Sequence, residues 1–185
     1  RMKDYTVSST GNIISTMLPS VFLDNIRDLK ESREIIAVDK SENIKHEKLI
    51  FQALIPDRIS FYRTLIREAF AKKQSVFICV PTRYDIEEWK NALVKGIEQY
   101  VFAFHSDMTK KSLIGSYNSV ISTEHPILII GTGMFLSIPR YDIKTIILEH
   151  ESSDSYKQLR KPYMDIRSFV EVLSSIQKSR LILGD

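Results

Sequence analysis

Residues 128–158 read LIIGTGMFLSIPRYDIKTIILEHESSDSYKQ and contain two apolar runs that each end in polar residues. The first run, 126–130, is followed by GTG, and the second run, 144–148, is followed by EHE. Short apolar runs bounded in this way are typical of strands that are buried on both faces of a parallel sheet. In an open parallel sheet, ligands bind at the carboxyl ends of the strands. The polar residues after each run are therefore candidates for a functional site.

Between residues 48 and 185 the chain alternates strand-like and helix-like segments. This alternation predicts an α/β fold with a mostly parallel sheet and helices on both faces. Right-handed crossovers would place the carboxyl ends of the strands along one edge, so we expect the loops that follow the strands to lie together there. The predicted strands are 49–54, 75–80, 100–104, 126–130, 144–148 and 181–183, and the predicted helices are 59–73, 85–99, 110–121 and 166–176.

Residues 1–47 are less regular, and we interpret them as an N-terminal segment or linker before a single lobe at 48–185. The sequence VFLDNIRDL at 21–29 predicts a short helix. Residues 31–48 are rich in charge and are interrupted by IIAV at 35–38, which predicts one short strand or helix. The first residues, Arg1-Met2, and the apolar run just before the last residues lead us to expect a fragment of a longer chain.

The composition is that of an ordinary globular domain, with 43% hydrophobic and 26% charged residues among 185. The net charge of +3 permits a nucleic-acid partner without arguing for one. The single cysteine, Cys79, lies in an apolar run and is predicted to be a buried strand thiol. One cysteine excludes an intramolecular disulfide and a multi-cysteine zinc cluster, and it favours a cytosolic protein. Since no apolar run approaches about 20 residues, no membrane partner is expected.

Several loops resemble, in order and at similar spacing, the first RecA-like lobe of the primosomal protein N′ (PriA) family of superfamily 2 DNA helicases. The most specific part of the resemblance is SSDSYKQ at 152–158, which is similar to the family's DSSYKQ. The resemblance covers residues 51 to 185 and implies a RecA-like, P-loop NTPase-type fold. It implies single-stranded or forked DNA and replication-restart proteins as partners, in the bacterial cytoplasm at the nucleoid. The matching segments are VPT at 80–82, FHSDMTKK at 104–111, IIGTGMFLSIP at 129–139, TIILEHESSDSYKQ at 145–158 and LILGD at 181–185.

The family's phosphate-binding loop, GSGKT, falls on Ile55–Ile59 (IPDRI), which contains no glycine. In such loops backbone N–H groups wrap the phosphates, the lysine neutralises them and the threonine hydroxyl binds magnesium. Asp57 and Arg58 are therefore candidate cofactor-binding residues of a degenerate site. Asp57, with Ser60 three residues on, is predicted to be the N-cap of the next helix, so that its carboxylate would occupy the phosphate position. We expect no cofactor, and ATP with Mg²⁺ only if the site still functions.

The family's DEEH motif falls on residues 149–152, so the resemblance makes Glu149, His150 and Glu151 candidate catalytic residues of a degenerate motif. Glu149 is a conceivable magnesium ligand. His150 takes the position that activates the attacking water in the family, and histidine can act as a base. Two alternatives are a metal site of two carboxylates and an imidazole, and a polar loop at a strand end. We assign no metal. We expect no ATP hydrolysis, because the phosphate-binding loop, its lysine and the threonine hydroxyl that binds magnesium are all missing.

The resemblance also implies DNA contacts, both in the loops after the strands and in an aromatic-rich loop. Hydroxyls and backbone N–H groups at loop tips suit phosphate contacts, and tyrosines between basic residues suit single-stranded DNA. The alternative is ordinary loop residues, with packed tyrosines on a solvated basic loop. Asp165 and Arg167 are expected to fix the aromatic-rich loop. The candidate DNA-binding residues are Thr82, Arg83, His105, Ser106, Thr132, Tyr156, Lys157, Arg160, Lys161 and Tyr163.

Three functions follow as hypotheses. The first is a DNA-binding lobe of a PriA-like protein in replication restart or DNA repair, without ATP turnover. The second is an ATP-dependent 3′–5′ DNA helicase that uses an atypical site. The third is a scaffold or protein-interaction lobe that has lost both ligands.

Overall fold

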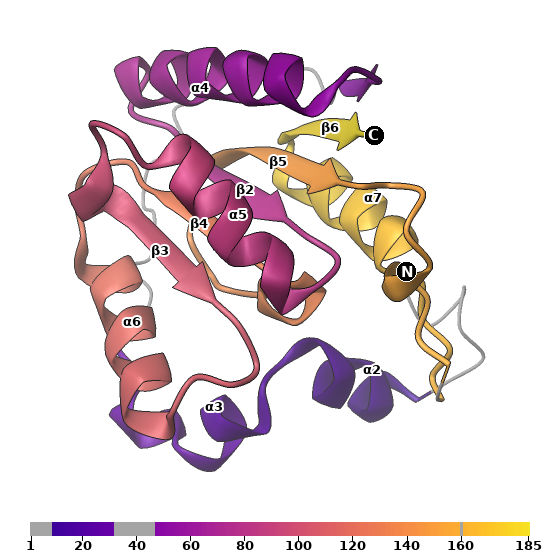
Figure 1. Cartoon of the computed structure of the whole chain (residues 1–185). Coiled ribbons are helices and arrows are strands. Elements are labelled where there is room, and N and C mark those ends of the chain that lie inside the picture. Colours follow the sequence, from indigo (N-terminus) through magenta and orange to yellow (C-terminus); the bar gives the residue numbers. More distant parts are fainter. Residues whose placement is uncertain (1–8, 32–46, 160) are drawn as a thin grey trace.

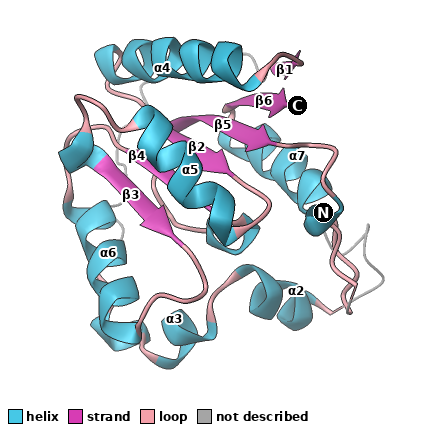
Figure 2. Ribbon diagram, in the orientation of Figure 1, coloured by secondary structure: helices cyan, strands magenta, loops and turns pink. Residues whose placement is uncertain are grey.

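The computed structural model describes residues 9–31, 47–159 and 161–185, and its centre is one sheet (Figures 1 and 2). All strand pairs in this part of the chain are parallel, in the order β1-β6-β5-β2-β4-β3. The predicted RecA-like α/β fold with a parallel sheet is therefore confirmed. The strands are β1 (Lys48–Phe51), β2 (Ser75–Cys79), β3 (Val101–Phe104), β4 (Leu128–Gly131), β5 (Ile143–Glu149) and β6 (Arg180–Gly184).

The helices lie on both faces of the sheet, as predicted. Helices α4 and α5 share a core with one face, whereas α6 and α7 share a second core with the other face (Figure 1). Within β2, Phe77 belongs to the α6/α7 core and Ile78 to the α4/α5 core. Because both faces are covered, the inner strands are nearly continuous apolar runs. The longer helices are α4 (Ile55–Ala71), α5 (Arg83–Leu93), α6 (Lys110–Ser122) and α7 (Ile166–Gln177).

Strand β1 ends earlier than predicted and helix α4 begins earlier. Leu54 is the N-cap residue of α4, in an extended conformation, and Pro56 falls in the first turn. Proline is well tolerated there because its missing N–H would have no helical partner. The N–H of Arg58 donates to the Leu54 carbonyl at 3.0 Å. Consequently the stretch 55–59, which resembles the position of a phosphate-binding loop, is helix.

Helix α5 spans 83–93 instead of the predicted 85–99. Its start is fixed by Asp85, whose carboxylate accepts hydrogen bonds from the Thr82 N–H at 2.9 Å and from the Thr82 hydroxyl at 2.7 Å. Beyond its end, Gly96 adopts φ +88°, which glycine allows at no steric cost. The chain thus leaves the helix before the 3₁₀ turn η2 (Glu98–Tyr100).

Residues 9–31 pack against the α6/α7 core through two short helices. Sequence patterns do not predict α2 (Thr10–Met17), although Ser9 caps it by accepting the Asn12 N–H at 3.2 Å. The predicted helix at 21–29 is divided into α3 (Ser20–Asp24) and the 3₁₀ turn η1 (Ile26–Asp28). The apolar run at 35–38 lies outside the described residues. The residues of this segment that join the α6/α7 core are Ile13, Met17 and Phe22.

The side chain of Cys79 is fully buried in β2, as predicted. Burial raises the pKa of its thiol, so the sulfur is protonated at neutral pH. Within the ranges that the structure describes, no helix has the length and apolar character required to cross a bilayer.

Candidate functional site

The carboxyl ends of the strands meet at one edge of the sheet, which we call the carboxyl edge. The Val80 N–H, after β2, donates to the Gly131 carbonyl at 3.0 Å, and the Glu151 N–H, after β5, donates to the Gly184 carbonyl at 3.0 Å. These contacts join loops that are far apart in the sequence. The parallel sheet therefore brings the candidate residues of different loops to one edge, as expected.

Glu149, the last residue of β5, is fully buried and is held by two side chains from α4. Arg58 Nη1 lies 2.8 Å from Glu149 Oε1, and the Tyr62 hydroxyl donates to Glu149 Oε2 at 2.6 Å. Both α4 residues are buried as well, Arg58 at 4% exposure and Tyr62 at 0%. We call Arg58, Tyr62 and Glu149 the Arg58 cluster. The cluster therefore links the stretch that resembles the phosphate-binding loop, through Arg58, to the stretch that resembles the DEEH motif, through Glu149.

Gly184, in β6, provides the space that this cluster occupies. A Cβ atom at residue 184 would overlap the Tyr62 hydroxyl and lie 2.5 Å from Glu149 Oε2. Because β6 lies between β1 and β5, its backbone passes directly beside the hydrogen bond. The glycine is therefore required by the close approach of two side chains.

The Glu149 carboxyl is poorly placed to bind magnesium. Burial raises the pKa of Glu149, and the hydrogen bond from Tyr62 and the charge of Arg58 partly oppose this rise. Burial also raises the pKa of the Tyr62 phenol, so the hydroxyl remains protonated and donates. Magnesium usually keeps several of its waters, and a fully buried carboxylate leaves no room for them. In this arrangement Glu149 is not available as a metal ligand.

The guanidinium of Arg58 is paired in charge but only partly hydrogen-bonded. Its contact with Glu149 through Nη1 lacks hydrogen-bond geometry, and its Nε has no hydrogen-bond partner in the described ranges. Nη2 lies 3.5 Å from His150 Nε2, and Cζ lies 6.0 Å from the centroid of the Trp89 ring. The predicted residue His150 thus lies beside Arg58, with its backbone at φ +50° in the left-handed region.

The connection between β1 and α4 is too short to be a phosphate-binding loop. The strand ends at Phe51 and the helix begins at Ile55, so three residues lie between them. A phosphate-binding loop presents a run of free backbone N–H groups to its ligand. Here the N–H groups of Asp57 and Arg58 both donate to the Leu54 carbonyl at 3.0 Å. These backbone donors are therefore already engaged.

Asp57 is not the N-cap of α4, which corrects the prediction. It is exposed within the first turn, and the N-cap is Leu54, which makes no side-chain cap. The prediction placed the N-cap at Asp57 and so started the helix too late, whereas Pro56 already lies in the first turn. The carboxylate still lies near the positive end of the helix dipole. A phosphate at this end would be repelled by Asp57.

Glu151 does not join Glu149 and His150 in a metal site. Its backbone is engaged, because its carbonyl accepts a hydrogen bond from Arg167 Nη1 at 3.1 Å. Across residues 9–31, 47–159 and 161–185, no group of three or more His, Cys, Asp or Glu side chains could hold a metal ion. The geometry therefore does not support the metal-site alternative.

Tyr156 is a core residue, which corrects its prediction as a DNA-stacking residue. It lies in the 3₁₀ turn η4 (Asp154–Tyr156) and is 1% exposed. Its hydroxyl lies 2.5 Å from the Glu149 carbonyl oxygen and 3.1 Å from the Cys79 carbonyl oxygen, so it links the ends of β5 and β2. A buried tyrosine usually finds such a partner for its hydroxyl. No base can stack on this ring.

The chain after Tyr156 forms a closed loop, residues 157–165, which we call the 157–165 loop. Lys157 and Asp165 form an antiparallel bridge at its base, and the Gln158 N–H donates to the Met164 carbonyl at 3.0 Å. Asp165 caps α7 and is paired with Arg167, whose Nη2 lies 2.8 Å from Oδ2. The expectation that Asp165 and Arg167 fix this loop is therefore confirmed.

The tip of the 157–165 loop is exposed. Tyr163 is 64% exposed and Lys161 is exposed as well, which leaves both accessible to a ligand. Lys157 is paired with Asp154 at 2.8 Å. Arg160, also a candidate DNA-binding residue, lies outside the described residues. Two of the predicted DNA contacts in this loop are thus free at the surface.

The candidates in the other loops have structural partners. Thr82 caps α5 through Asp85. Arg83 forms an ion pair with Asp107, and its Cζ lies 4.7 Å from the Tyr84 ring centroid. An arginine paired in this way has less charge to offer a phosphate. Its neighbourhood is mixed in sign and not a basic patch.

His105, Ser106 and Thr132 lie at the same edge. Thr132 is half-buried and precedes the 3₁₀ turn η3 (Gly133–Phe135) as its N-cap. Ser106 is exposed, and its hydroxyl lies 3.1 Å from a carboxylate oxygen of Asp107. His105 is half-buried, and its Nδ1 has no hydrogen-bond partner in the part of the chain described. None of these contacts distinguishes a DNA site from ordinary loop structure.

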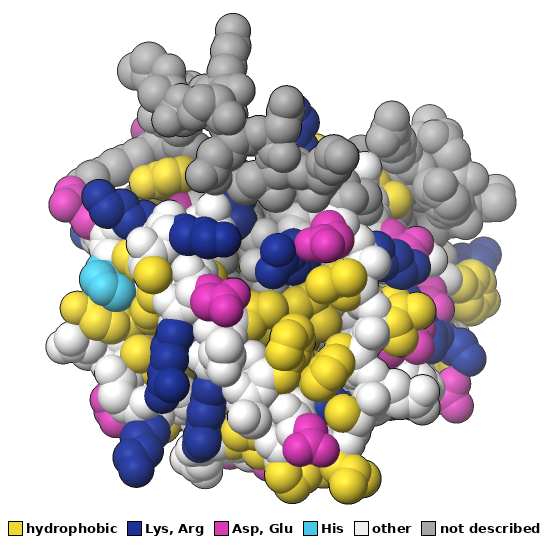
Figure 3. Space-filling view, turned by 90° about the horizontal axis from the view of Figure 1, so that it is seen from above, with side chains coloured by type: hydrophobic (Ala, Val, Ile, Leu, Met, Phe, Trp, Pro, Cys, Tyr) yellow, Lys and Arg dark blue, Asp and Glu magenta, His cyan; other side chains and the backbone are white. Residues whose placement is uncertain are grey.

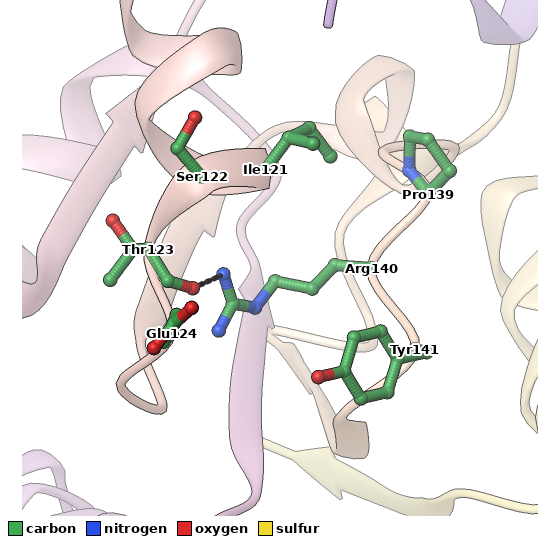
Figure 4. Close-up of a pocket in the computed structure, with 7 residues that line it drawn as sticks. All are labelled: Ile121, Ser122, Thr123, Glu124, Pro139, Arg140 and Tyr141. Atoms are coloured by element: carbon green, nitrogen blue, oxygen red, sulfur yellow. Dashed lines mark hydrogen bonds between the residues drawn. The ribbon is translucent and has the colours of Figure 1, made fainter. Parts of the chain in front are cut away.

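A second buried arginine lies at the opposite end of the strands, which we call the amino edge. Arg140 Nε and Nη2 donate to the two carboxylate oxygens of Asp142 at 2.7 and 2.9 Å. The other donors bind backbone carbonyls of Val120 and of His125, the latter at 2.8 Å. Figure 4 shows the remaining bond, from Arg140 to the Thr123 carbonyl at 2.8 Å. All five N–H groups of the guanidinium are therefore engaged. We call Arg140 and Asp142 the Arg140 cluster; sequence patterns do not predict it.

The chain matches no protein-family model, and a search of curated proteins finds no significant match.

Proposed function

We propose that this chain is a PriA-like RecA-type lobe that binds single-stranded or forked DNA at its carboxyl edge without hydrolysing ATP. Its setting would be replication restart or DNA repair at the bacterial nucleoid, with replication-restart proteins as partners. Support comes from the order of the motif-like loops in the sequence and from the parallel sheet, which gathers those loops at one edge.

The observation that carries the proposal is the Arg58 cluster. A magnesium nucleotide needs a free cation for its phosphates and a free carboxylate for its metal. Arg58 and Glu149 are the residues that resemble these groups, and they neutralise each other at 2.8 Å inside the protein. An internal ion pair thus takes the place of the ligand.

Opening this cluster for a nucleotide would be costly. Separating Arg58 from Glu149 would leave two buried polar groups without their partners, at a cost of about 1–3 kcal/mol for each group. A phosphate at the start of α4 would also meet the exposed carboxylate of Asp57. The three-residue connection before α4 offers no run of free N–H groups in compensation. Nucleotide binding is therefore expected to be absent or very weak.

The DNA-binding part of the proposal rests on the 157–165 loop. Tyr163 is 64% exposed, and Lys161, two residues earlier in the loop, is exposed as well. A base that stacks on an aromatic ring gains about 1–3 kcal/mol, and nearby cations track the backbone. Thr132 and Ser106, in neighbouring loops, could add contacts to phosphates.

The experiment is a thermal-shift measurement of the chain with Mg-ATP, with Mg-ADP and with a short single-stranded oligonucleotide. A ligand at 100 times its dissociation constant stabilises a fold by about 2.7 kcal/mol, which is easily seen. We expect no shift with either nucleotide and a higher melting temperature with the oligonucleotide. The variant Tyr163→Ala should lose the oligonucleotide shift, whereas Tyr84→Ala, an exposed tyrosine that follows β2, should keep it.

A shift with nucleotide would contradict the proposal and favour the helicase with an atypical site. A second candidate function is a protein-interaction lobe. It is favoured by the pairing of Arg83 with Asp107 and of Lys157 with Asp154, which lowers the positive potential of the carboxyl edge. If neither nucleotide nor oligonucleotide shifts the melting temperature, this second candidate replaces the first.

A further inference from the structure

The amino edge of the sheet contains a cavity of about 120 Å³ between the end of α4 and the starts of β5 and β6. Lys72 comes from the end of α4, Lys144 from β5 and Arg180 from β6. Arg180 lies next to Lys144 because it pairs with Thr145 in the sheet. Three cations from three different elements are thus brought to one concave site, far from the carboxyl edge.

These cations are less neutralised than those of the carboxyl edge. Lys72 and Lys144 line the cavity without an ion pair to any described residue, and Arg180 is paired with Glu47 at 2.9 Å. Glu68 is the acidic residue of the lining. By contrast, Arg83, Lys157 and Arg167 at the carboxyl edge each form an ion pair.

Two further lysines flank the cavity in sequence, and both are exposed. Lys73 follows Lys72, and Lys178 precedes β6 by two residues. The five basic residues (Lys72, Lys73, Lys144, Lys178 and Arg180) against Glu47 and Glu68 give a local charge of +3. Figure 3 looks down on α4 and shows several Lys and Arg side chains on the left, the side on which Figure 1 places the end of α4.

The neutral groups of the cavity also suit a phosphate. Gln74 offers an amide and Thr145 a hydroxyl, side chains that commonly contact phosphate oxygens. The carbonyls at the end of α4 would repel an anion if they were free. Those of Glu68, Ala69 and Phe70 already accept bonds from the N–H groups of residues 72–74, which lessens this repulsion.

We propose that this amino-edge cavity and its flanking lysines bind the phosphates of a nucleic-acid backbone. Three cations that line one small concavity, with two more nearby in the sequence, suit a polyanion whose phosphates follow one another along a chain. A lipid surface fits less well, because the apolar residues of the lining, Leu65 and Ala69, are buried and cannot insert into a membrane. The site stands independently of the carboxyl-edge loops and would give the lobe a second contact with the same strand.

The test is the salt dependence of binding to a fluorescein-labelled single-stranded oligonucleotide, followed by fluorescence anisotropy. Each phosphate contact to a single strand contributes about 0.7 to the slope of log K against log salt. The variant Lys72→Gln/Lys144→Gln should therefore flatten the slope by about 1.4. The control Lys90→Gln/Lys95→Gln removes the same charge on and after α5 and should leave the slope unchanged. Lys72→Gln alone, at an exposed position, should flatten it by about 0.7.

The comparison with Lys157→Gln/Lys161→Gln separates this proposal from the carboxyl-edge proposal. If only that variant flattens the slope, the amino-edge site does not exist and the carboxyl edge carries the binding. An unchanged slope for Lys72→Gln/Lys144→Gln, with circular dichroism showing a folded protein, overturns the inference. Co-sedimentation with phosphatidylserine vesicles through the same lysines, without oligonucleotide binding, would overturn it in favour of a membrane surface.

Discussion

Two arginines that are buried in the described part of the chain, Arg58 and Arg140, lie at opposite edges of the sheet and differ in their hydrogen-bond partners. Arg140 uses every N–H donor, and three of its partners are backbone carbonyls around the end of α6. Arg58 has side chains as partners, and its Nε remains without a hydrogen bond among the described residues. The same residue type therefore binds backbone carbonyls at one edge and contacts only side chains at the other.

The difference determines whether each cluster could be replaced by apolar side chains. Backbone carbonyls remain when a side chain is mutated, so an apolar residue in place of Arg140 cannot supply the hydrogen bonds that Arg140 donates to them. The partners of Arg58 are side chains, and a few substitutions could replace the whole set by apolar residues. A buried ion pair of that kind is often equal in stability to a well-packed apolar replacement.

The largest effect is expected for Arg140→Met. This variant leaves Asp142 buried without its cation and removes the side-chain donors that bind the carbonyls of Val120 and Thr123. Breaking a buried pair in this way costs about 3–5 kcal/mol. Urea denaturation measures the loss, and a loss below that of Arg58→Met would contradict the comparison.

A smaller loss, about 1–3 kcal/mol, is expected for Arg58→Met. Glu149 keeps the hydrogen bond from Tyr62, and its raised pKa allows it to take up a proton when the guanidinium is removed. The triple variant Arg58→Met/Tyr62→Phe/Glu149→Leu should recover most of the stability in the same urea assay. Failure to recover would mean that the cluster is as integral to the fold as Arg140.

The next effect concerns the hydroxyl that joins the Arg58 cluster to β2. Tyr156→Phe removes the hydrogen bonds to the Glu149 and Cys79 carbonyls and should cost about 1 kcal/mol. Tyr163→Phe is the matched control, because the exposed Tyr163 hydroxyl makes no hydrogen bond to a described residue. Equal melting temperatures for the two variants would show that Tyr156 is not a structural link.

The smallest effect is a pH dependence. The pKa of Glu149 is raised by burial in the folded protein, whereas in the unfolded chain it lies near about 4.3. As pH rises, the unfolded chain releases the Glu149 proton before the folded protein does. The contribution of Glu149 to the free energy of unfolding is therefore complete below the pKa of the unfolded chain and is lost as pH rises through the pKa of the folded protein. Glu149→Gln should remove this part of the decline in urea titrations above about pH 4. Glu88→Gln, at an exposed position of α5, should leave the decline unchanged.

The elements of the fold are predictable from the sequence because the inner strands are buried on both faces. Runs such as SVFICV at 75–80 cannot be exposed, so their position needs no knowledge of tertiary contacts. The boundaries depend on local backbone chemistry instead. Pro56 in a first turn and Gly96 at positive φ each moved a helix end away from the apolar pattern.

The site is only partly predictable. Arg58 and Glu149 can be selected as candidates, but their contact depends on the position of β6 and on the space at Gly184. Tyr62 fits an apolar helix face, and Tyr156 lies among polar and charged residues, yet both hydroxyls are buried donors. Arg140 binds backbone carbonyls, which every residue type has, so the sequence does not reveal these partners.

The position of β6 has a consequence for the order in which the lobe assembles. β6 is the last described strand to be synthesised, and it lies between β1 and β5. Among the described strands β1 pairs with β6 alone, so it lacks its described partner until residues 180–184 have been made. Pairings of such long sequence separation form slowly, since a large loop must close before any contact rewards it. β6 completes the sheet by inserting between β1, at the edge, and β5. A nascent chain that ends before β6 therefore leaves β1 without this partner and prone to aggregation.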